Sequence, residues 1–133
     1  MTNKTLADDY LMRAKIRLLA LRTLRDASGY ADVVRESQEL VELILKAVLR
    51  RAGVEPPHWH DVSSLLIENQ SRLANVIVPE LNRIVTLSKK LRKERELSYY
   101  GDEDYLPTEE YTLADANHYI GECEWLLELV ERK

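Results

Sequence analysis

The side chains best suited to binding a phosphate lie within one short stretch in the second half of the chain. If that stretch is helical, Arg95, Ser98 and Tyr99 fall on one face and bring together a guanidinium, a hydroxyl and a phenol. A planar guanidinium holds phosphate through two parallel hydrogen bonds. We therefore predict a nucleotide- or RNA-binding surface made of Arg92, Arg95, Ser98 and Tyr99. No catalytic residue is assigned outright, and the candidates are Arg95, Tyr99 and Tyr100.

The same stretch carries the basic cluster of the sequence, formed by Lys89, Lys90, Arg92, Lys93 and Arg95. Basic residues with tyrosines nearby are typical of nucleic-acid-binding surfaces. A plainer interpretation, which the acidic residues that follow favour, is a solvated face near a helix C-terminus, where positive charge suits the helix dipole. Arg95 then lies along the surface with its head in water, or pairs with Asp102, Glu103 or Asp104. Both interpretations stay open at this point.

Other residues that often carry chemistry indicate structure instead. Residues 58–60 are His-Trp-His, but two histidines without converging acidic or cysteine ligands do not make a metal site. Asp61 is better placed as a helix N-cap, so we expect no metal and no cofactor. Cys123 lies on an apolar helical stripe and is expected to be a small buried residue rather than a nucleophile. Glu42 and Lys46, four positions apart, are expected to form a surface pair.

Length and composition indicate one cytoplasmic domain spanning residues 1–133. Of the 133 residues, 45% are hydrophobic and 32% are charged, which excludes a disordered chain. The most apolar stretch, residues 40–49, contains a glutamate and a lysine, so we expect no membrane span. A polar N-terminus and a single cysteine favour a reducing, cytoplasmic compartment. A net charge of −4 predicts no generic attraction to nucleic acid.

Helical periodicity runs through nearly the whole sequence, and no stretch alternates with period two. We predict an all-α protein, an up-and-down four-helix bundle with an additional short helix. The expected helices cover about residues 5–27, 31–52, 61–69, 72 or 79 to 100, and 112 to the end. Their inner faces carry the following residues: Leu11, Ala14, Leu18, Leu21 and Leu24; Val33, Ser37, Leu40, Val41, Ile44, Val48 and Ala52; Val62, Leu65 and Leu66; Leu73, Val76, Ile77, Leu81, Ile84, Leu87, Ser88 and Leu91; Leu113, Ala116, Ile120, Cys123, Leu127 and Val130.

The last predicted helix carries a second apolar stripe outside the first. Trp125 and Leu129 lie off the main face, so this helix is expected to be buried on more than one side. We therefore predict a twofold-symmetric homodimer in which the partner subunit covers some of the excess apolar surface.

Several ordered segments together resemble the HEPN domain family (higher eukaryote and prokaryote nucleotide-binding). Residues 30–49, with an aromatic residue at the start and Leu-Lys-Ala-Val-Leu at the end, resemble the second helix of that family. Gly53, the two prolines at 56–57 and the His-Asp-Val step at 60–62 follow in the family's order. Residues 91–100 resemble its arginine-to-tyrosine segment at the end of the third long helix.

The resemblance implies a helical bundle of four to five helices that often forms a homodimer. Such domains are frequently encoded beside a minimal nucleotidyltransferase as a toxin–antitoxin pair. Many relatives are metal-independent endoribonucleases with an R-x4-6-H motif, whose arginine and histidine act on the ribose 2′-OH and the phosphate across the dimer.

This chain departs from the ribonuclease motif. The residues at the motif spacing after Arg95 are Tyr100, Gly101 and Asp102, and those after Arg92 include no histidine either. Tyrosine, with a pKa of about 10, is a poor general base at neutral pH. We therefore predict a non-catalytic interaction or nucleotide-binding module, the partner of a minimal nucleotidyltransferase. The alternative is an endoribonuclease toxin with a degenerate motif.

Overall fold

The protein is all-α in its computed structural model, which describes residues 3–56 and 61–132, with the side chains of 6–56, 61–95, 98 and 100–132. The four long helices are α1 (Asn3–Asp26), α2 (Tyr30–Arg51), α4 (Leu81–Tyr99) and α6 (Leu113–Glu131). Shorter elements connect them: α3 (Val62–Glu68), α5 (Pro107–Glu110) and the 3-10 turns η1 (Gln70–Arg72) and η2 (Val78–Glu80). The residues described include no β-strand, and the predicted fold class is confirmed.

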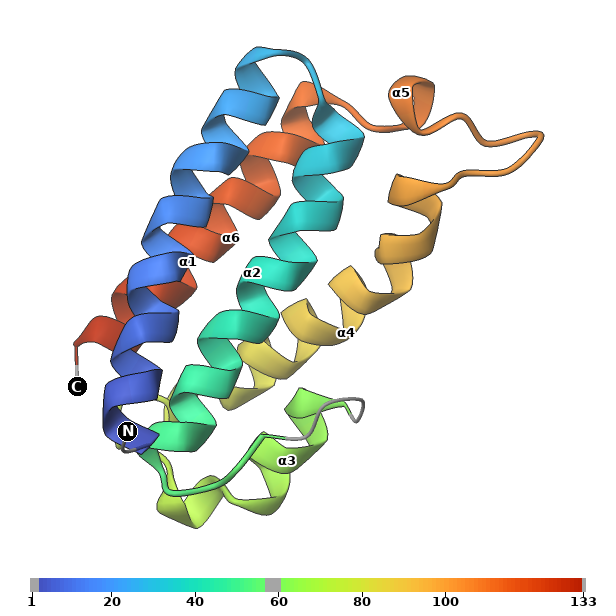
Figure 1. The fold of residues 1–133 in the computed structure, drawn as a ribbon. Coiled ribbons are helices and arrows are strands. Elements are labelled where there is room, and N and C mark those ends of the chain that lie inside the picture. Colours follow the sequence, from blue (N-terminus) through green and yellow to red (C-terminus); the bar gives the residue numbers. More distant parts are fainter. Residues whose placement is uncertain (1–2, 57–60, 133) are drawn as a thin grey trace.

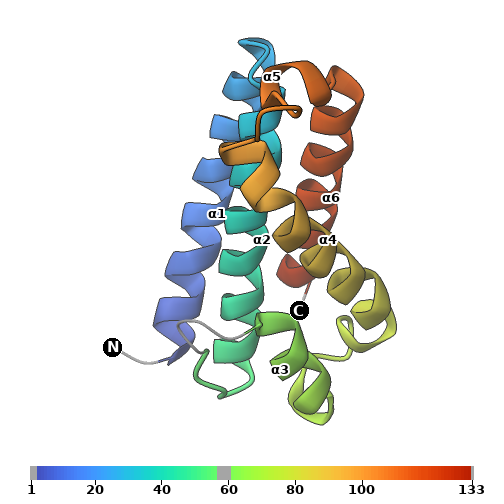
Figure 2. The same ribbon diagram turned by 90° about the vertical axis from the view of Figure 1, so that its right-hand side faces the viewer.

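The long helices alternate in direction, up, down, up and down along the chain (Figure 1). Helix α2 is central because it packs against α1, α4 and α6. Helix α4 crosses its neighbours obliquely, so its last turns lean toward α5 at the upper end of the molecule (Figures 1 and 2). Helix α3 lies at the opposite end, between the end of α2 and the start of α4. This arrangement places one side of α2 between α1 and the second half of α4.

Local signals set most of the helix boundaries. Asp61 caps α3 by accepting a hydrogen bond from the Ser63 backbone N–H at 3.0 Å. Thr112 and Asp115 form the reciprocal capping box that begins α6. Gly53 follows α2 with φ of +76°, a conformation that favours glycine, so the chain turns sharply there. All three boundaries agree with the sequence-based expectations.

Two boundaries differ from expectation. The third long helix begins at Leu81, after a 3-10 turn that contains Pro79, so the earlier start near residue 72 is wrong. Proline fixes φ for the first helical turn but lacks the N–H that a longer helix would need. The one-turn helix α5 was not expected, and Leu113 is 48% exposed rather than on the inner face, because it occupies the first position of α6.

The apolar stripes read from the sequence form the core. Nearly all of their residues are buried, and Leu24, Ala52, Leu65 and Val76 are half-buried at its margin. Ser37 and Ser88, which interrupt two of the stripes, are buried with them. Across the described helices, none is both long and apolar enough to cross a membrane.

The second apolar stripe of α6, formed by Trp125 and Leu129, is covered by other helices of the same chain. The prediction that a partner subunit covers these two residues is therefore wrong. Leu129 is buried, and Trp125 packs against the core. The Arg83 guanidinium lies 3.6 Å from the centre of the Trp125 ring and completes its cover. Three large apolar side chains of α1 stay exposed along one side of that helix: Met12, Ile16 and Leu19.

Candidate functional site

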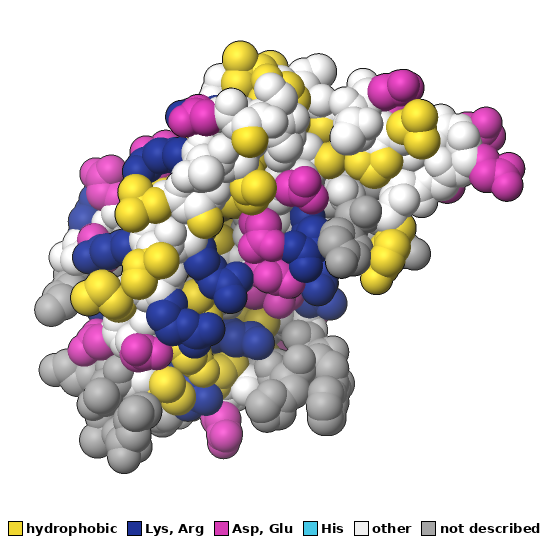
Figure 3. All heavy atoms as spheres, turned by 45° about the horizontal axis from the view of Figure 1, so that its top comes forward, with side chains coloured by type: hydrophobic (Ala, Val, Ile, Leu, Met, Phe, Trp, Pro, Cys, Tyr) yellow, Lys and Arg dark blue, Asp and Glu magenta, His cyan; other side chains and the backbone are white. Residues whose placement is uncertain are grey.

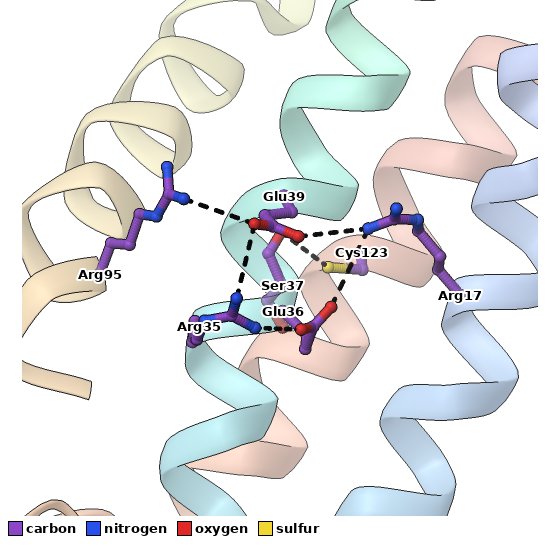
Figure 4. A network of polar contacts seen from close by, with 7 residues as sticks. All are labelled: Arg17, Arg35, Glu36, Ser37, Glu39, Arg95 and Cys123. Carbon is purple, nitrogen blue, oxygen red and sulfur yellow. Dashed lines mark hydrogen bonds and ion pairs between the residues drawn. The ribbon is translucent and has the colours of Figure 1, made fainter. Parts of the chain in front are cut away.

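Arg95 lies near the end of α4, and its guanidinium is directed toward α2 (Figure 4). Its Nη2 is 3.4 Å from Oε1 of Glu39, and half of its side chain is exposed. The acidic residues after α4 are not its partners, so the expected pairing with Asp102, Glu103 or Asp104 is wrong. Arg95 therefore links α4 to α2 through an ion pair and stays open to solvent.

Glu39 is the centre of a group of charged side chains from three helices (Figure 4). Its carboxylate accepts a hydrogen bond from Arg17 of α1 at 3.3 Å and lies 3.8 Å from Nη2 of Arg35, one turn earlier on α2. Both arginines also pair with Glu36. We call Arg17, Arg35, Glu36, Glu39 and Arg95 the Glu39 cluster. Its three guanidiniums and two carboxylates leave one net positive charge.

The surface beside the Glu39 cluster is hollowed to a volume of about 290 Å³. Basic and acidic side chains lie next to one another in the middle of this face (Figure 3). The hollow is lined by Arg17, Glu39, Glu42, Leu43, Lys46 and Arg95. Glu42 does not pair with Lys46 as expected, because its carboxylate lies 3.6 Å from Nη1 of Arg92. The Lys46 ammonium therefore enters the hollow without an ion-pair partner among the described residues.

Arg92 links α4 to both α2 and α3. Its Nη1 lies 3.5 Å from Oδ1 of Asp61 as well as near Glu42. Burial raises the pKa of Asp61, but hydrogen bonds from Ser63 and the positive charges of Arg92 and Lys89 outweigh it, so that pKa lies below its usual value. Asp61 is therefore ionised at neutral pH and neutralises part of the charge of Arg92.

The remaining predicted site residues do not all share the surface of Arg95. Ser98 is buried, and its hydroxyl donates a hydrogen bond to the Arg95 carbonyl at 3.0 Å. That hydroxyl therefore faces the protein rather than a ligand. Tyr100 is 75% exposed. The side chain of Tyr99 lies outside the described residues. The prediction that it shares a face with Arg95 therefore also falls outside what the structure describes.

Two tyrosines farther along the chain lie close to α4 but are held in the protonated form. Burial, with a smaller contribution from the negative charge of Glu94, raises the pKa of Tyr111 far above its usual value. Burial, together with the nearby carboxylates of Glu94 and Asp115, raises the pKa of Tyr119 to about 12. A phenol with a raised pKa is a worse proton acceptor at neutral pH. Neither tyrosine therefore takes the place of the missing histidine.

Two further sequence features, Cys123 and the histidines near residue 59, have residue types that can serve a catalytic or metal-binding role. Cys123 is fully buried, and burial raises the pKa of its thiol to about 12, so it is an inert core residue as expected. The His-Trp-His sequence at residues 58–60 lies outside the described residues. In the part of the chain that the structure covers, no three His, Cys, Asp or Glu residues gather as a metal site requires.

The sequence contains a signal for the Glu39 cluster in the spacing of charged residues along α2. Arg35, Glu39, Glu42 and Lys46 follow the spacing of four, three and four that places residues on one helical face, beside the apolar face of α2. A continuous charged stripe along the central helix indicates that charged partners lie on the neighbouring helices. Arg17 lies off the apolar stripe of α1, and its position alone does not identify it as a partner of Glu39.

Comparison with known proteins assigns the family. A family model of the HEPN domain matches residues 7–133, nearly the whole chain. The chain belongs to the HEPN family. Neither the curated proteins nor the solved structures provide a match. HEPN domains are nucleotide-binding or ribonuclease modules. In this HEPN domain Arg95 lies near the end of α4 and belongs to the Glu39 cluster.

Proposed function

We propose that this HEPN domain binds the phosphates of a nucleotide or of RNA through the hollow beside the Glu39 cluster and does not cleave them. The observation that carries the proposal is the convergence of Arg17, Arg35 and Arg95, from three helices, on one carboxylate that is largely covered. Arginines already placed around an anion lose little freedom when a phosphate arrives, which favours binding. Lys46 supplies a further cation, and Arg92 extends the basic surface along α4.

The Glu39 carboxylate competes with a bound phosphate for the same arginine guanidiniums. Each arginine has five N–H donors, and the hydrogen bond of Arg95 to Glu39 uses one of them. A phosphate therefore adds to these guanidiniums or displaces Glu39 from them. The carboxylate keeps the arginines in place when no ligand is bound, and it lowers the affinity for anions of low charge. Ligands with several phosphates, such as a nucleoside triphosphate or an RNA strand, are favoured.

The proposal excludes efficient cleavage for a chemical reason. The family's ribonuclease motif needs an imidazole that exchanges a proton near neutral pH, and tyrosines occupy the corresponding part of this sequence. Loss of one general base removes about 10²–10⁴-fold in rate. Because Arg95 is present and the histidine is not, the domain keeps phosphate binding but not cleavage. The endoribonuclease alternative requires Tyr99 or Tyr100 to act as the base.

We further propose that the domain acts as one cytoplasmic unit and pairs with a minimal nucleotidyltransferase in a toxin–antitoxin-like system.

We also propose that the domain forms a homodimer through α1. Met12, Ile16 and Leu19 form an exposed apolar stripe on that helix. Asp8 and Asp9 lie before the stripe, and Arg22 and Arg25 lie after it. Antiparallel contact between two α1 helices around a twofold axis therefore places the acidic end of each beside the basic end of the other.

Lys46 provides a clean test of the phosphate site because it forms no ion pair with any residue that the structure describes, so its removal breaks none of those contacts. Binding of a labelled single-stranded RNA oligonucleotide is measured by fluorescence anisotropy in the presence of a metal chelator. Lys46→Ala should weaken binding by about 3–10-fold, since one charge-assisted contact is lost. Arg132→Ala is the control, because Arg132 is an exposed cation that pairs with Glu128 outside the cluster. Equal binding by wild type and Lys46→Ala contradicts the proposed site.

A further inference from the structure

A second, larger cavity lies where the first turns of α1 and the last turns of α2 and α6 meet residues 72–77. Its volume is about 450 Å³, within the range typical of small-molecule sites. It lies at the end of the molecule that carries both chain termini (Figure 1). None of the residues that line it belongs to the hollow beside the Glu39 cluster.

The wall of this end cavity is apolar. Val48 of α2, Leu73 and Ile77 of the connecting segment and Val130 of α6 form it, and all four are buried. Ala52 and Ala74 also line the cavity, and their small side chains leave it open. A surface of this kind favours an alkyl or aromatic body, because burying apolar surface is favourable at about 25 cal/mol per Å².

The remaining lining residues are charged, and two of the three are arginines. Nη1 of Arg51 donates to the Val130 carbonyl at 2.9 Å, and its Nη2 lies 3.5 Å from Asp8. Nη2 of Arg72 lies 3.4 Å from the Gly53 carbonyl. A Cβ on residue 53 would come within 3.2 Å of that nitrogen, so the glycine leaves room for the guanidinium. Both arginines keep further N–H donors available.

We propose that the end cavity binds a small carboxylate with an alkyl or aromatic body. Two guanidiniums and one carboxylate give the cavity a single net positive charge, which matches a monoanionic headgroup better than a doubly charged phosphate. The Arg51 and Arg72 guanidiniums hold the carboxylate, and the apolar wall takes the body. This ligand site is separate from the phosphate site proposed above.

The test uses octanoate as the probe, with the full chain labelled with ¹⁵N. Amide shifts in a titration should change at residues 48–53, 72–77 and 130. Octanoate should bind about tenfold more tightly than octanamide, which lacks the charge, and than acetate, which lacks the body. Octyl phosphate should bind no more tightly than octanoate.

Two exposed positions locate the site without disturbing the core. Arg72→Ala should weaken octanoate binding by about 5–10-fold, and Ala74→Trp should abolish it by filling the cavity. Arg132→Ala, which removes the exposed arginine that follows α6 and pairs with Glu128, is the control and should bind octanoate normally. RNA binding should not change in Arg72→Ala. Shift changes confined to other surfaces, equal binding of octanamide, or normal binding by Ala74→Trp would overturn the proposal.

Discussion

Replacing Glu39 by glutamine should make the protein less stable and, at the same time, a better binder of RNA. Glutamine keeps the size and the hydrogen-bonding capacity of glutamate but removes its charge. Glu39 contacts Arg17, Arg35 and Arg95 at 3.3–3.8 Å, and it is mostly covered by them. Half-exposed ion pairs of this kind contribute about 0.2–1 kcal/mol each. The free energy of unfolding should therefore fall by about 1 kcal/mol.

The effect on binding has the opposite sign. A phosphate that shares one guanidinium with Glu39 lies about 5–6 Å from its carboxylate, where two unit charges in a water-like medium repel by about 0.8 kcal/mol. A lower local dielectric and a second phosphate charge raise this to about 1–1.5 kcal/mol. RNA affinity should therefore rise about 5–10-fold in Glu39→Gln.

Thermal unfolding and fluorescence anisotropy with a single-stranded RNA oligonucleotide measure the two effects on the same samples. Glu124→Gln is the matched control, because it removes the carboxylate that pairs with Arg22 at 3.0 Å outside the cluster. This control should lose a little stability and show unchanged affinity. If Glu39→Gln binds RNA no more tightly than wild type, Glu39 does not compete with the ligand and the reasoning fails.

Three further predictions concern assembly, pH and the exposed tyrosine. Ile16→Lys should convert the proposed α1 dimer to a monomer in light scattering without loss of helical content, because Ile16 is 60% exposed; a dimer that persists in this variant contradicts the α1 interface. Asp61→Ala should lower stability by about 1 kcal/mol near pH 6, through loss of the N-cap. Because the folded-state pKa of Asp61 is lowered, the difference from wild type in denaturant unfolding should shrink as the pH falls below about 4 through that pKa; a difference that grows there contradicts this. Tyr100→Phe should leave RNA binding unchanged within about twofold, since Tyr100 is not among the residues that line the hollow; a larger loss in anisotropy assigns Tyr100 to the site.

The fold was predictable from the sequence because its signals are local. The stripe from Val33 to Val48 fixes the buried face of α2, and Asp61 and Thr112 mark helix starts by side-chain chemistry that depends only on the next three residues. The late start of α4 was ambiguous, since the pattern around residues 72–77 is apolar with helical spacing although the chain forms turns there.

The candidate site was only partly predictable because its partners come from distant parts of the chain. Arg95 stood out by its place on α4, but its partner Glu39 lies 56 positions earlier in the sequence, and Arg17 lies a further 22 positions before that. No local pattern specifies which of several carboxylates a surface arginine contacts. The packing of α1 and α4 against α2 decides it. The same packing buries Ser98 while Arg95, three residues earlier, stays exposed.

The most direct test of the central claim is a paired measurement of RNA binding and RNA cleavage by wild type and Arg95→Ala with a metal chelator present. Wild type should bind single-stranded RNA with an affinity that falls as salt rises, and it should produce no cleavage above background over hours. Arg95→Ala should bind about 3–10-fold more weakly, with the slope of log affinity against log salt reduced by about 0.7. Cleavage by wild type that disappears in Arg95→Ala would contradict the account, because it would show that the domain is a ribonuclease that works without the histidine.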